Sequence, residues 1–255
     1  MLTYKTPEDF IKMTKAGKVV SNIHYEIYKS TKVGMKLKEL DQIAKRIIEK
    51  SNVVSSFLGY PQPGVKDYPA YICASPNESI VHGIPNKYRV KDGDIISIDV
   101  GVSYEGYHAD AAFTFGIGNV SDEDKQLMQI TKHALNEAIK LVKDGQKLGT
   151  VGHKIDKIAK KNNYGNVRNY VGHGIGLEMH EEPQVPHYGE KNKGFELKTG
   201  MAICIEPMFN IGSEETVVDS DGWTVKTADS SKSAHFEHTI GLTEEGTSVF
   251  TENLF

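Results

Sequence analysis

Two apolar segments around a short turn constrain the fold of this chain more than any other feature. Between residues 94 and 103, isoleucine and valine alternate with small or acidic residues, as in a half-buried strand. Tyr104-Glu105-Gly106 is typical of a turn, and residues 107–115 are expected to return as a second strand. A two-residue loop at 104–105 would place Asp99 directly opposite Asp110.

Two carboxylates that face each other inside an apolar hairpin need compensation. Directly opposed side chains lie about 5 Å apart at Cβ, where like charges are destabilising. A shared proton or a bound cation would relieve that repulsion. The simpler alternative is a register displaced by one residue, with one of the two aspartates pointing to solvent. The hairpin alone leaves both interpretations open.

The length, charge and cysteine content narrow the class of protein. The chain has 255 residues, enough for one large domain or two small ones with a buried core. Its formal charge of −4 argues against a broad basic surface for nucleic acid. Two cysteines, Cys73 and Cys204, are too few for a disulfide framework or a thiolate zinc site and favour a reducing compartment. Because there is no apolar leader and no run of membrane-spanning length, we expect a cytoplasmic protein with no membrane partner.

The sequence predicts helices in two pairs, each pair followed by strands. The first helix begins at Thr6-Pro7, where a capping hydroxyl precedes a proline in the first turn. The helices are expected at about residues 6–28, 38–49, 121–143 and 149–162. Short strands are expected between and after them, including residues 71–74. This order predicts an α+β fold in which helices cover an antiparallel sheet. We expect one domain over residues 1–255, with similar halves at about 1–118 and 119–255.

Three further segments place polar residues in apolar surroundings. His173 lies among the glycines of residues 172–176, where backbone can approach closely. Glu206 ends the apolar strand 202–205, and Glu237 is expected within another strand. Burying either carboxylate ionised and unpaired would cost several kcal/mol. Taken singly, a structural histidine and two acids that point to water are the simpler interpretations.

Taken together, these residues indicate a metal centre. Four carboxylates and one neutral imidazole carry a charge that two divalent cations would balance. Oxygen ligands with one imidazole suit Mn, Fe, Co or Zn better than a thiolate-type site does. A pair of such ions that activates water would fit a hydrolase.

At these residues the chain resembles the type I methionine aminopeptidases, in their short bacterial form, over essentially its full length. The matching motifs are residues 81–85 (VHGIP), 97–100 (SIDV), 107–110 (YHAD), 172–176 (GHGIG), 205–207 (IEP), 221–227 (DGWTVKT) and 237–239 (EHT). The resemblance implies the "pita-bread" fold, in which two pseudo-symmetric halves enclose a central dinuclear site. It also implies the metal ligands Asp99, Asp110, His173, Glu206 and Glu237.

The resemblance also implies roles for individual residues. Glu206 would shuttle a proton, His180 would steady the scissile carbonyl, and His82 would contact the scissile nitrogen. The substrate-binding residues would be Phe57, Tyr68, Cys73, His82, Met179, His180 and Trp223. Residues 59–69, which include prolines, depart from the family's pattern.

The implied function is metal-dependent removal of the initiator methionine from nascent chains whose second residue is small. The implied partners are nascent N-termini at or near the ribosome, with no nucleic acid bound directly and the protein a monomer. Type II enzymes carry a helical insertion before the last ligand. Only thirty-one positions separate Glu206 from Glu237, which leaves no room for it.

Two other functions fit the same fold. Prolidases and aminopeptidase P share the fold and the metal set, but they normally carry an additional N-terminal domain. Some pita-bread proteins are binding modules without metal, and these lack the ligands that are all present here. We therefore expect an active enzyme.

Overall fold

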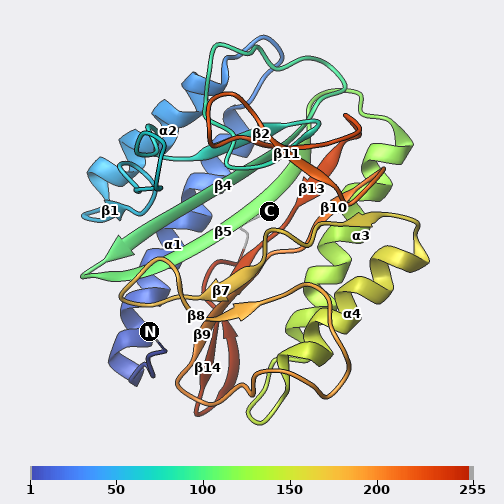
Figure 1. The fold of residues 1–255 in the computed structure, drawn as a ribbon. Helices are drawn as coiled ribbons and strands as arrows, with labels where there is room; N and C mark the ends of the chain where they lie inside the picture. The colour runs from blue at the N-terminus through green and yellow to red at the C-terminus, as the bar shows by residue number, and fades with distance from the viewer. Residues whose placement is uncertain (1, 253–255) are drawn as a thin grey trace.

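The computed structural model describes residues 2–252 and places four helices in that part of the chain against antiparallel sheets (Figure 1). The helices are α1 (Pro7–Ser30), α2 (Leu37–Lys50), α3 (Asp122–Ile139) and α4 (Leu148–Lys161). Each predicted helix is present, although α3 ends earlier than expected. Helix α1 begins with a capping box, in which the side chains of Thr6 and Asp9 each accept from the other residue's backbone N–H.

The described strands are mostly short and pair only in antiparallel fashion. In the first half they are β1 (Val54–Ser55), β2 (Cys73–Pro76), β3 (Ser79–Val81), β4 (Ile95–Tyr104) and β5 (Tyr107–Gly116). In the second half they are β6 (Gly165–Asn166), β7 (Gly172–Gly174), β8 (Glu181–Val185), β9 (Ala202–Ile205), β10 (Met208–Asn210), β11 (Thr216–Val218), β12 (Val225–Thr227), β13 (Ser233–His235), β14 (His238–Thr243) and β15 (Gly246–Val249). The strand expected at 71–74 lies two residues later, as β2.

The β4–β5 hairpin forms as predicted, but its register differs from the expected one. The loop is Glu105-Gly106, with positive φ at both residues (49° and 82°), as a two-residue type I′ turn requires. Tyr104 therefore pairs with Tyr107, Asp110 faces Gly101, and Asp99 faces Ala112. The direct Asp99–Asp110 pairing was wrong. Because the shift is by two residues, both aspartates still point to the same face as diagonal neighbours.

The second difference concerns burial of the hairpin. The alternation predicts one face in water, yet every residue from Ile95 to Ser103 is buried. Helix α1 packs on β4 and β5 from one side. The polar face meets the second half of the chain, where Ser97 and Thr114 share a hydrogen bond of 2.8 Å and Thr114 donates to the carbonyl of His235. The polar residues of β4 thus line an internal junction.

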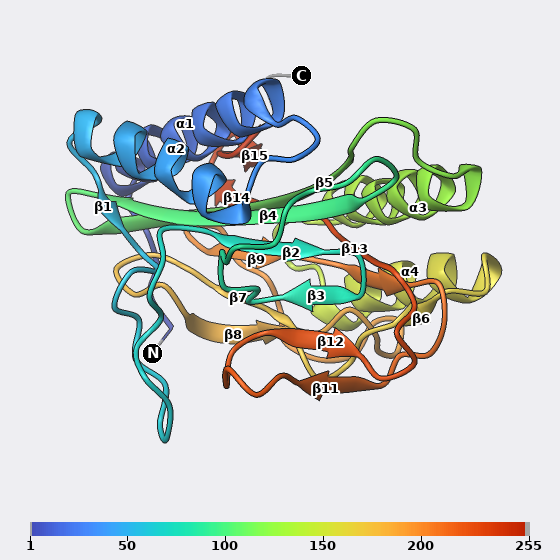
Figure 2. The same ribbon diagram turned by 90° about the horizontal axis from the view of Figure 1, so that it is seen from above.

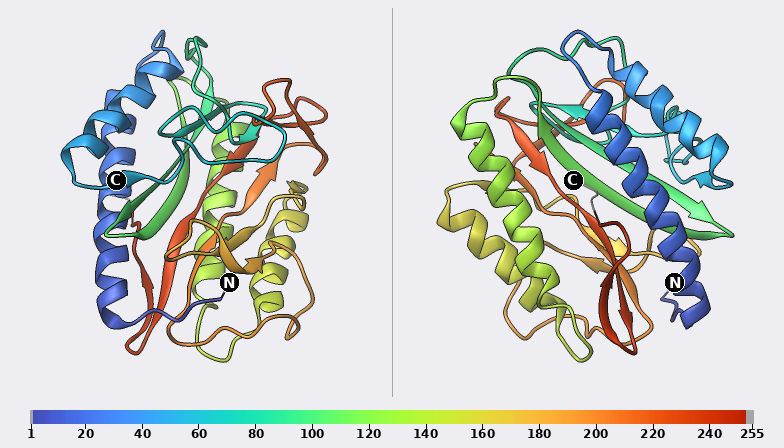
Figure 3. Two further views of the ribbon diagram at one scale, coloured as in Figure 1. Left: turned by 60° about the vertical axis from the view of Figure 1, so that its left-hand side comes forward. Right: turned by 180° about the vertical axis from the view of Figure 1, so that it is seen from behind.

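The helices lie on the outer side of the strands. Seen from behind, both helix pairs lie on the same side of the strands, with α1 and α2 over the first half of the chain and α3 and α4 over the second half (Figure 3). Residues 58–69, in the loop after β1, and the strands β11 and β12 lie away from the helices (Figure 2). A continuous apolar core joins the helices to β4, β5, β9 and β14. Among the described residues, no helix is both long and apolar enough to cross a membrane.

Candidate metal centre and substrate pocket

One cavity of about 170 Å³ brings together every site residue singled out from the sequence. These residues come from both halves of the chain and are Phe57, Tyr68, Cys73, His82, Asp99, Asp110, His173, Met179, His180, Glu206, Trp223 and Glu237. Tyr60 and Gln62 complete its lining.

Strands β4 and β5 supply the two aspartates. Asp99 stands between Cys73 of β2 and Ala112 of β5 in the sheet. The backbone of Asp110 is held by Thr239 of β14, whose hydroxyl accepts from its N–H at 2.9 Å and donates to its carbonyl at 2.7 Å. Gly101 is closely packed, since a Cβ there would lie 3.0 Å from Phe57 Cε1, 3.1 Å from Ser56 Cβ and 3.3 Å from Asp110 Oδ1. The hairpin is thereby joined to the second half at the aspartate itself.

The two glutamates lie at strand ends. Glu206 directly follows β9, as predicted, and its N–H donates to His187 Nε2 at 3.2 Å. Glu237 lies between β13 and β14 and not within a strand as expected. Its N–H donates instead to the carbonyl of Ala112 in β5, at 2.9 Å. This bond places Glu237 beside the aspartate hairpin.

His173 occupies the centre of β7, between two glycines that close packing requires. A Cβ on Gly172 would lie 2.3 Å from the carbonyl oxygen of Cys204, and one on Gly174 would lie 2.2 Å from that of Glu182. The Nδ1–H of His173 donates to the carbonyl of Gly174 at 2.8 Å. The ring's lone pair is therefore on Nε2, which lies 3.7 Å from Glu206 Oε1.

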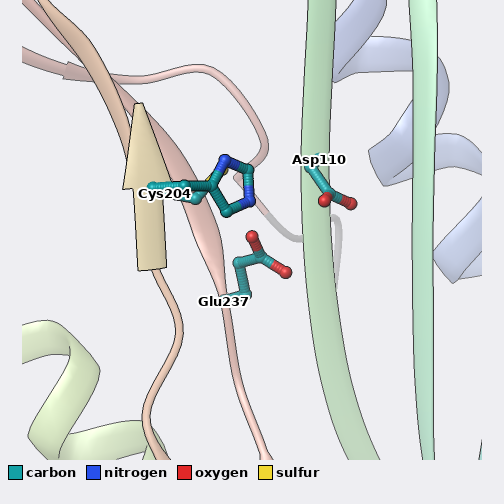
Figure 4. A group of neighbouring side chains, drawn as sticks. Asp110, Cys204 and Glu237 are labelled. Atoms are coloured by element: carbon teal, nitrogen blue, oxygen red, sulfur yellow. The ribbon is translucent and has the colours of Figure 1, made fainter. Parts of the chain in front are cut away.

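One group of possible ligand atoms joins three expected residues to one that was not expected. Atoms of Asp110, His173, Cys204 and Glu237, all buried, lie within 4.8 Å of one another (Figure 4). Asp99 and Glu206 line the same cavity outside this group. The Cys204 thiol also lies 3.5 Å from the hydroxyl of Thr239. Sequence reasoning treated Cys204 only as one of two scattered cysteines, and no motif places it at the centre.

In the absence of a cation, burial and mutual repulsion disfavour the ionised form of these carboxyl groups. Burial, followed by the charges of Asp110 and Glu237, raises the pKa of Asp99 well above its usual value. Burial raises the pKa of Asp110 to about 7. Burial and the neighbouring carboxylates also raise the pKa values of Glu206 and Glu237 well above normal. A cation among them would reverse these shifts.

The surrounding imidazoles are neutral at physiological pH. Burial, with His180 nearby, lowers the pKa of His82 to about 4 and that of His173 to about 3. Burial, with His108 nearby, also lowers the pKa of His180. The histidines therefore offer lone pairs and neutral N–H donors, and they add no positive charge to balance the acids.

These residues fit a metal ion. Within residues 2–252, Asp99 Oδ1, Asp110 Oδ1 and Glu237 Oε1 are buried with no hydrogen-bond partner. Buried carboxylate oxygens without a hydrogen-bond partner are costly unless they coordinate a cation. The donor set, oxygen-rich with one imidazole lone pair, is that of a divalent metal site.

An apolar pocket adjoins the carboxylates. Trp223 packs edge-on against Tyr68, with ring centroids 5.1 Å apart, and donates from Nε1 to the carbonyl of Lys66 at 2.8 Å. The hydroxyl of Tyr68 donates toward the carbonyls of Ile72 and Gly83. Phe57, Cys73 and Met179 belong to the same buried cluster. The pocket can therefore hold an apolar side chain beside the polar centre.

Comparison with known proteins agrees with this geometry. The profile described as "Metallopeptidase family M24" matches residues 11–244. Methionine aminopeptidase 1 of Bacillus subtilis is 46% identical over 251 residues, which cover 98% of this chain and 99% of the relative. Methionine aminopeptidase of Escherichia coli is 41% identical over 252 residues, which cover 98% and 94%.

Solved structures give the same result. A methionine aminopeptidase from Thermotoga maritima superposes with a TM-score of 0.95 at 41% identity, covering 99% of this chain and 100% of that one. A prolidase from Pyrococcus furiosus superposes at 0.79 with 22% identity, covering 99% of this chain and 66% of that one, which shows the shared fold alone.

The fold is that of a pita-bread metallopeptidase, and it contains a buried cluster of possible metal ligands. The chain belongs to metallopeptidase family M24 and, within it, to the methionine aminopeptidases of the short bacterial type I form. It is a metalloexopeptidase, a hydrolase that removes N-terminal methionine with the help of a divalent metal.

Proposed function

We propose that the 170 Å³ cavity is the active site and that it cleaves methionine from nascent chains whose second residue is small. The observation that carries this proposal is the junction of buried, unpaired carboxylate oxygens with an apolar pocket in one cavity. An apolar N-terminal side chain can occupy the pocket while the peptide bond that follows that residue lies at the polar centre.

We assign Asp99, Asp110, His173, Glu206 and Glu237 as ligands of two divalent ions. Four carboxylates and one neutral imidazole carry the charge that two such ions balance. The donor set suits Co, Mn, Fe or Zn. When bound, such ions supply Lewis-acid polarisation of the carbonyl and lower the pKa of bound water.

The chain's own residues then move protons and steady charge. Glu206 takes the proton of the attacking water and passes it to the departing amine. His180, whose ring is neutral, donates an N–H to the carbonyl oxygen as negative charge develops there. His82 directly follows β3 and lines the cavity, and its neutral ring would contact the scissile nitrogen.

The methionine side chain is held by Phe57, Tyr68, Cys73, Met179 and Trp223. His82 and His180 complete the substrate contacts at the polar edge of the pocket. We propose that the ligands crowd the space beyond the scissile bond, so that a small second residue is accepted and a large one is overpacked.

We further propose that residues 1–255 form one catalytic domain, with pseudo-symmetric halves at about 1–118 and 119–255. The repeated order of two helices followed by strands supports this division. We also propose that the enzyme is a cytoplasmic monomer that meets nascent N-termini at or near the ribosome, without binding nucleic acid directly.

One assay series tests the function. Metal-free protein should not hydrolyse Met-Ala-Ser, and added Mn²⁺, Fe²⁺, Co²⁺ or Zn²⁺ should restore hydrolysis. Met-Leu-Ser should be cleaved at least ~10²-fold more slowly. Leu is larger by one methylene than Val, the largest apolar residue expected to be accepted, and that methylene and overpacking each cost about 1–3 kcal/mol. A Lys-Pro peptide should remain intact. Full activity in verified metal-free protein, or a preference for Lys-Pro, would refute the proposal.

A further inference from the structure

We propose that Tyr60 is a positioning residue that fixes the tautomer of His180, so that Nε2 carries the ring proton. The hydroxyl of Tyr60 lies 2.6 Å from His180 Nδ1, and the two rings meet edge-on with centroids 5.3 Å apart. Both residues line the active-site cavity. The inference deepens the proposed function, because it concerns the group assigned to the carbonyl oxygen.

The direction of this hydrogen bond follows from the chemistry of the two groups. A neutral imidazole has one N–H donor and one lone pair, whereas a phenol can donate or accept. The imidazole nitrogen is a much stronger acceptor than the phenol oxygen, so the phenol O–H donates to Nδ1. Burial, with Glu178 nearby, raises the pKa of Tyr60, so the phenol keeps its proton. The single ring proton of His180 is then on Nε2.

The neighbouring imidazole, that of His173, has the opposite tautomer. The His173 and His180 rings pack with centroids 4.3 Å apart. Nδ1–H of His173 donates to a backbone carbonyl, which leaves the lone pair on Nε2. The partner of His180 Nδ1 is instead a hydroxyl, which can donate. Different partners at Nδ1 therefore make one ring a ligand and the other a hydrogen-bond donor.

The loop that carries Tyr60 is built to hold it in place. The N–H of Tyr60 donates to the carbonyl of Phe57, and its carbonyl accepts from the N–H of Tyr68, both at 2.9 Å. Gly59, with φ of 81°, makes the turn and donates to the carbonyl of Tyr68 at 2.8 Å. On the far side, the carbonyl of Lys66 accepts from Trp223. Residues 59–69, which depart from the family's pattern, thus hold Tyr60 in hydrogen-bonding contact with His180.

The tautomer decides what His180 can do at the carbonyl. With Nδ1 engaged by Tyr60, Nε2 is the nitrogen left for a bound group. An Nε2–H donor stabilises negative charge on the oxygen, whereas a lone pair there would repel it. Loss of the Tyr60 hydroxyl releases this constraint without changing the pocket's shape.

Tyr60→Phe is the primary test, made in the full-length protein loaded with Zn²⁺, a diamagnetic probe ion. We expect kcat for Met-Ala-Ser to fall roughly 10-fold, less than for full loss of a donor, with KM nearly unchanged. Histidine ¹⁵N NMR should show His180 with the proton on Nε2 in the wild type and as a tautomer mixture in Tyr60→Phe. An unchanged His180 tautomer in Tyr60→Phe would overturn the inference.

Two control variants separate this contact from general effects. Tyr68→Phe deletes a hydroxyl from the same cavity that bonds to Ile72 and Gly83, and it should leave the His180 ¹⁵N spectrum unchanged. Tyr104→Phe lies in the strand next to the hairpin turn, outside the cavity lining, and should leave kcat unchanged. A His180 spectrum altered equally by Tyr68→Phe would assign the effect to the pocket as a whole and overturn the inference.

A double-mutant cycle shows whether Tyr60 acts through His180. In a His180→Ala background, Tyr60→Phe should cost no further activity, because its partner is already gone. An equal loss in both backgrounds would mean that Tyr60 acts on the substrate independently, which contradicts the inference. If His180→Ala alone left kcat intact, the proposed role of His180 would fail, while the NMR result would still decide the tautomer.

Discussion

Lys5 Nζ lies 2.7 Å from Glu181 Oε2 in an ion pair whose side chains are only 3% and 1% exposed. Thr3 donates to the same oxygen at 2.7 Å. Burial alone would raise the pKa of Glu181, yet the hydrogen bonds from Lys5 and Thr3 bring it below its usual value. The residue before Glu181 is His180, so the segment preceding α1 anchors the turn that carries a residue of the cavity lining.

The first prediction concerns this ion pair. Lys5→Met leaves Glu181 buried without its partner, which should lower the free energy of unfolding by about 3–5 kcal/mol. Urea denaturation measures the change. The matched control is Lys12→Met, which removes an exposed pair with Glu105 at 3.6 Å and should cost at most about 1 kcal/mol. Equal losses in the free energy of unfolding for the two substitutions would show that the buried pair stabilises the fold no more than the exposed one.

The second prediction concerns pH and the metal-free protein. The pKa of Asp110 is raised from 3.8 to about 7, so between these values the folded chain holds a proton that the unfolded chain has released. This contribution to stability is complete below the unfolded pKa and is lost as the pH rises through 7. Buried histidines such as His173, with a pKa of about 3, act in the opposite sense up to about pH 6.5.

Comparison with Asp110→Asn isolates this carboxyl from the histidines. In the presence of chelator, the stability of the wild type relative to Asp110→Asn should fall between pH 5 and pH 7.5. Thermal unfolding at several pH values measures the difference. A stability difference that stays constant over this range would show that Asp110 does not have the raised pKa.

The third prediction separates proton transfer from carbonyl stabilisation. Glu206→Gln should preserve the fold but lower kcat severely, because the amide cannot take up the proton and ligates weakly. His180→Ala should lower kcat by roughly 10²-fold or more with nearly unchanged metal content. Steady-state kinetics and metal analysis check both variants. A large loss of bound metal from His180→Ala would make His180 a ligand and contradict the assignment.

The fourth prediction concerns methionine recognition. Trp223→Ala removes a wall of the pocket and the bond to the Lys66 carbonyl, and it should reduce kcat/KM for Met-Ala-Ser by about tenfold or more. Trp223→Phe keeps an aromatic wall and should lose less. A bulky substitution at Cys73, which also lines the cavity, should act in the same direction. Unchanged kcat/KM in Trp223→Ala and in the Cys73 variant would place the pocket elsewhere.

Local physical chemistry made much of the fold predictable. The starts of α1 and α3 follow from the capping side chains of Thr6 and Ser121, and the two-pair order follows from amphipathic spacing, because both depend on residues within one turn of each other. Asp99 and Asp110 were correctly expected to share a face, since alternation along a strand has a period of two. Their pairing was wrong because the turn needs positive φ at Glu105 and Gly106, and the sequence does not display φ.

The sequence by itself determined five of the residues that could bind a metal, since carboxylates and an imidazole in apolar segments suit that chemistry. It also determined the family, through motifs spread along the whole chain. Tertiary structure alone decided that Cys204 lies among the candidate ligands and that Tyr60 meets His180 across 120 positions of sequence. The physical reason is range: side-chain type and periodicity act locally, whereas a loop's contact with a distant ring is fixed only when both halves pack.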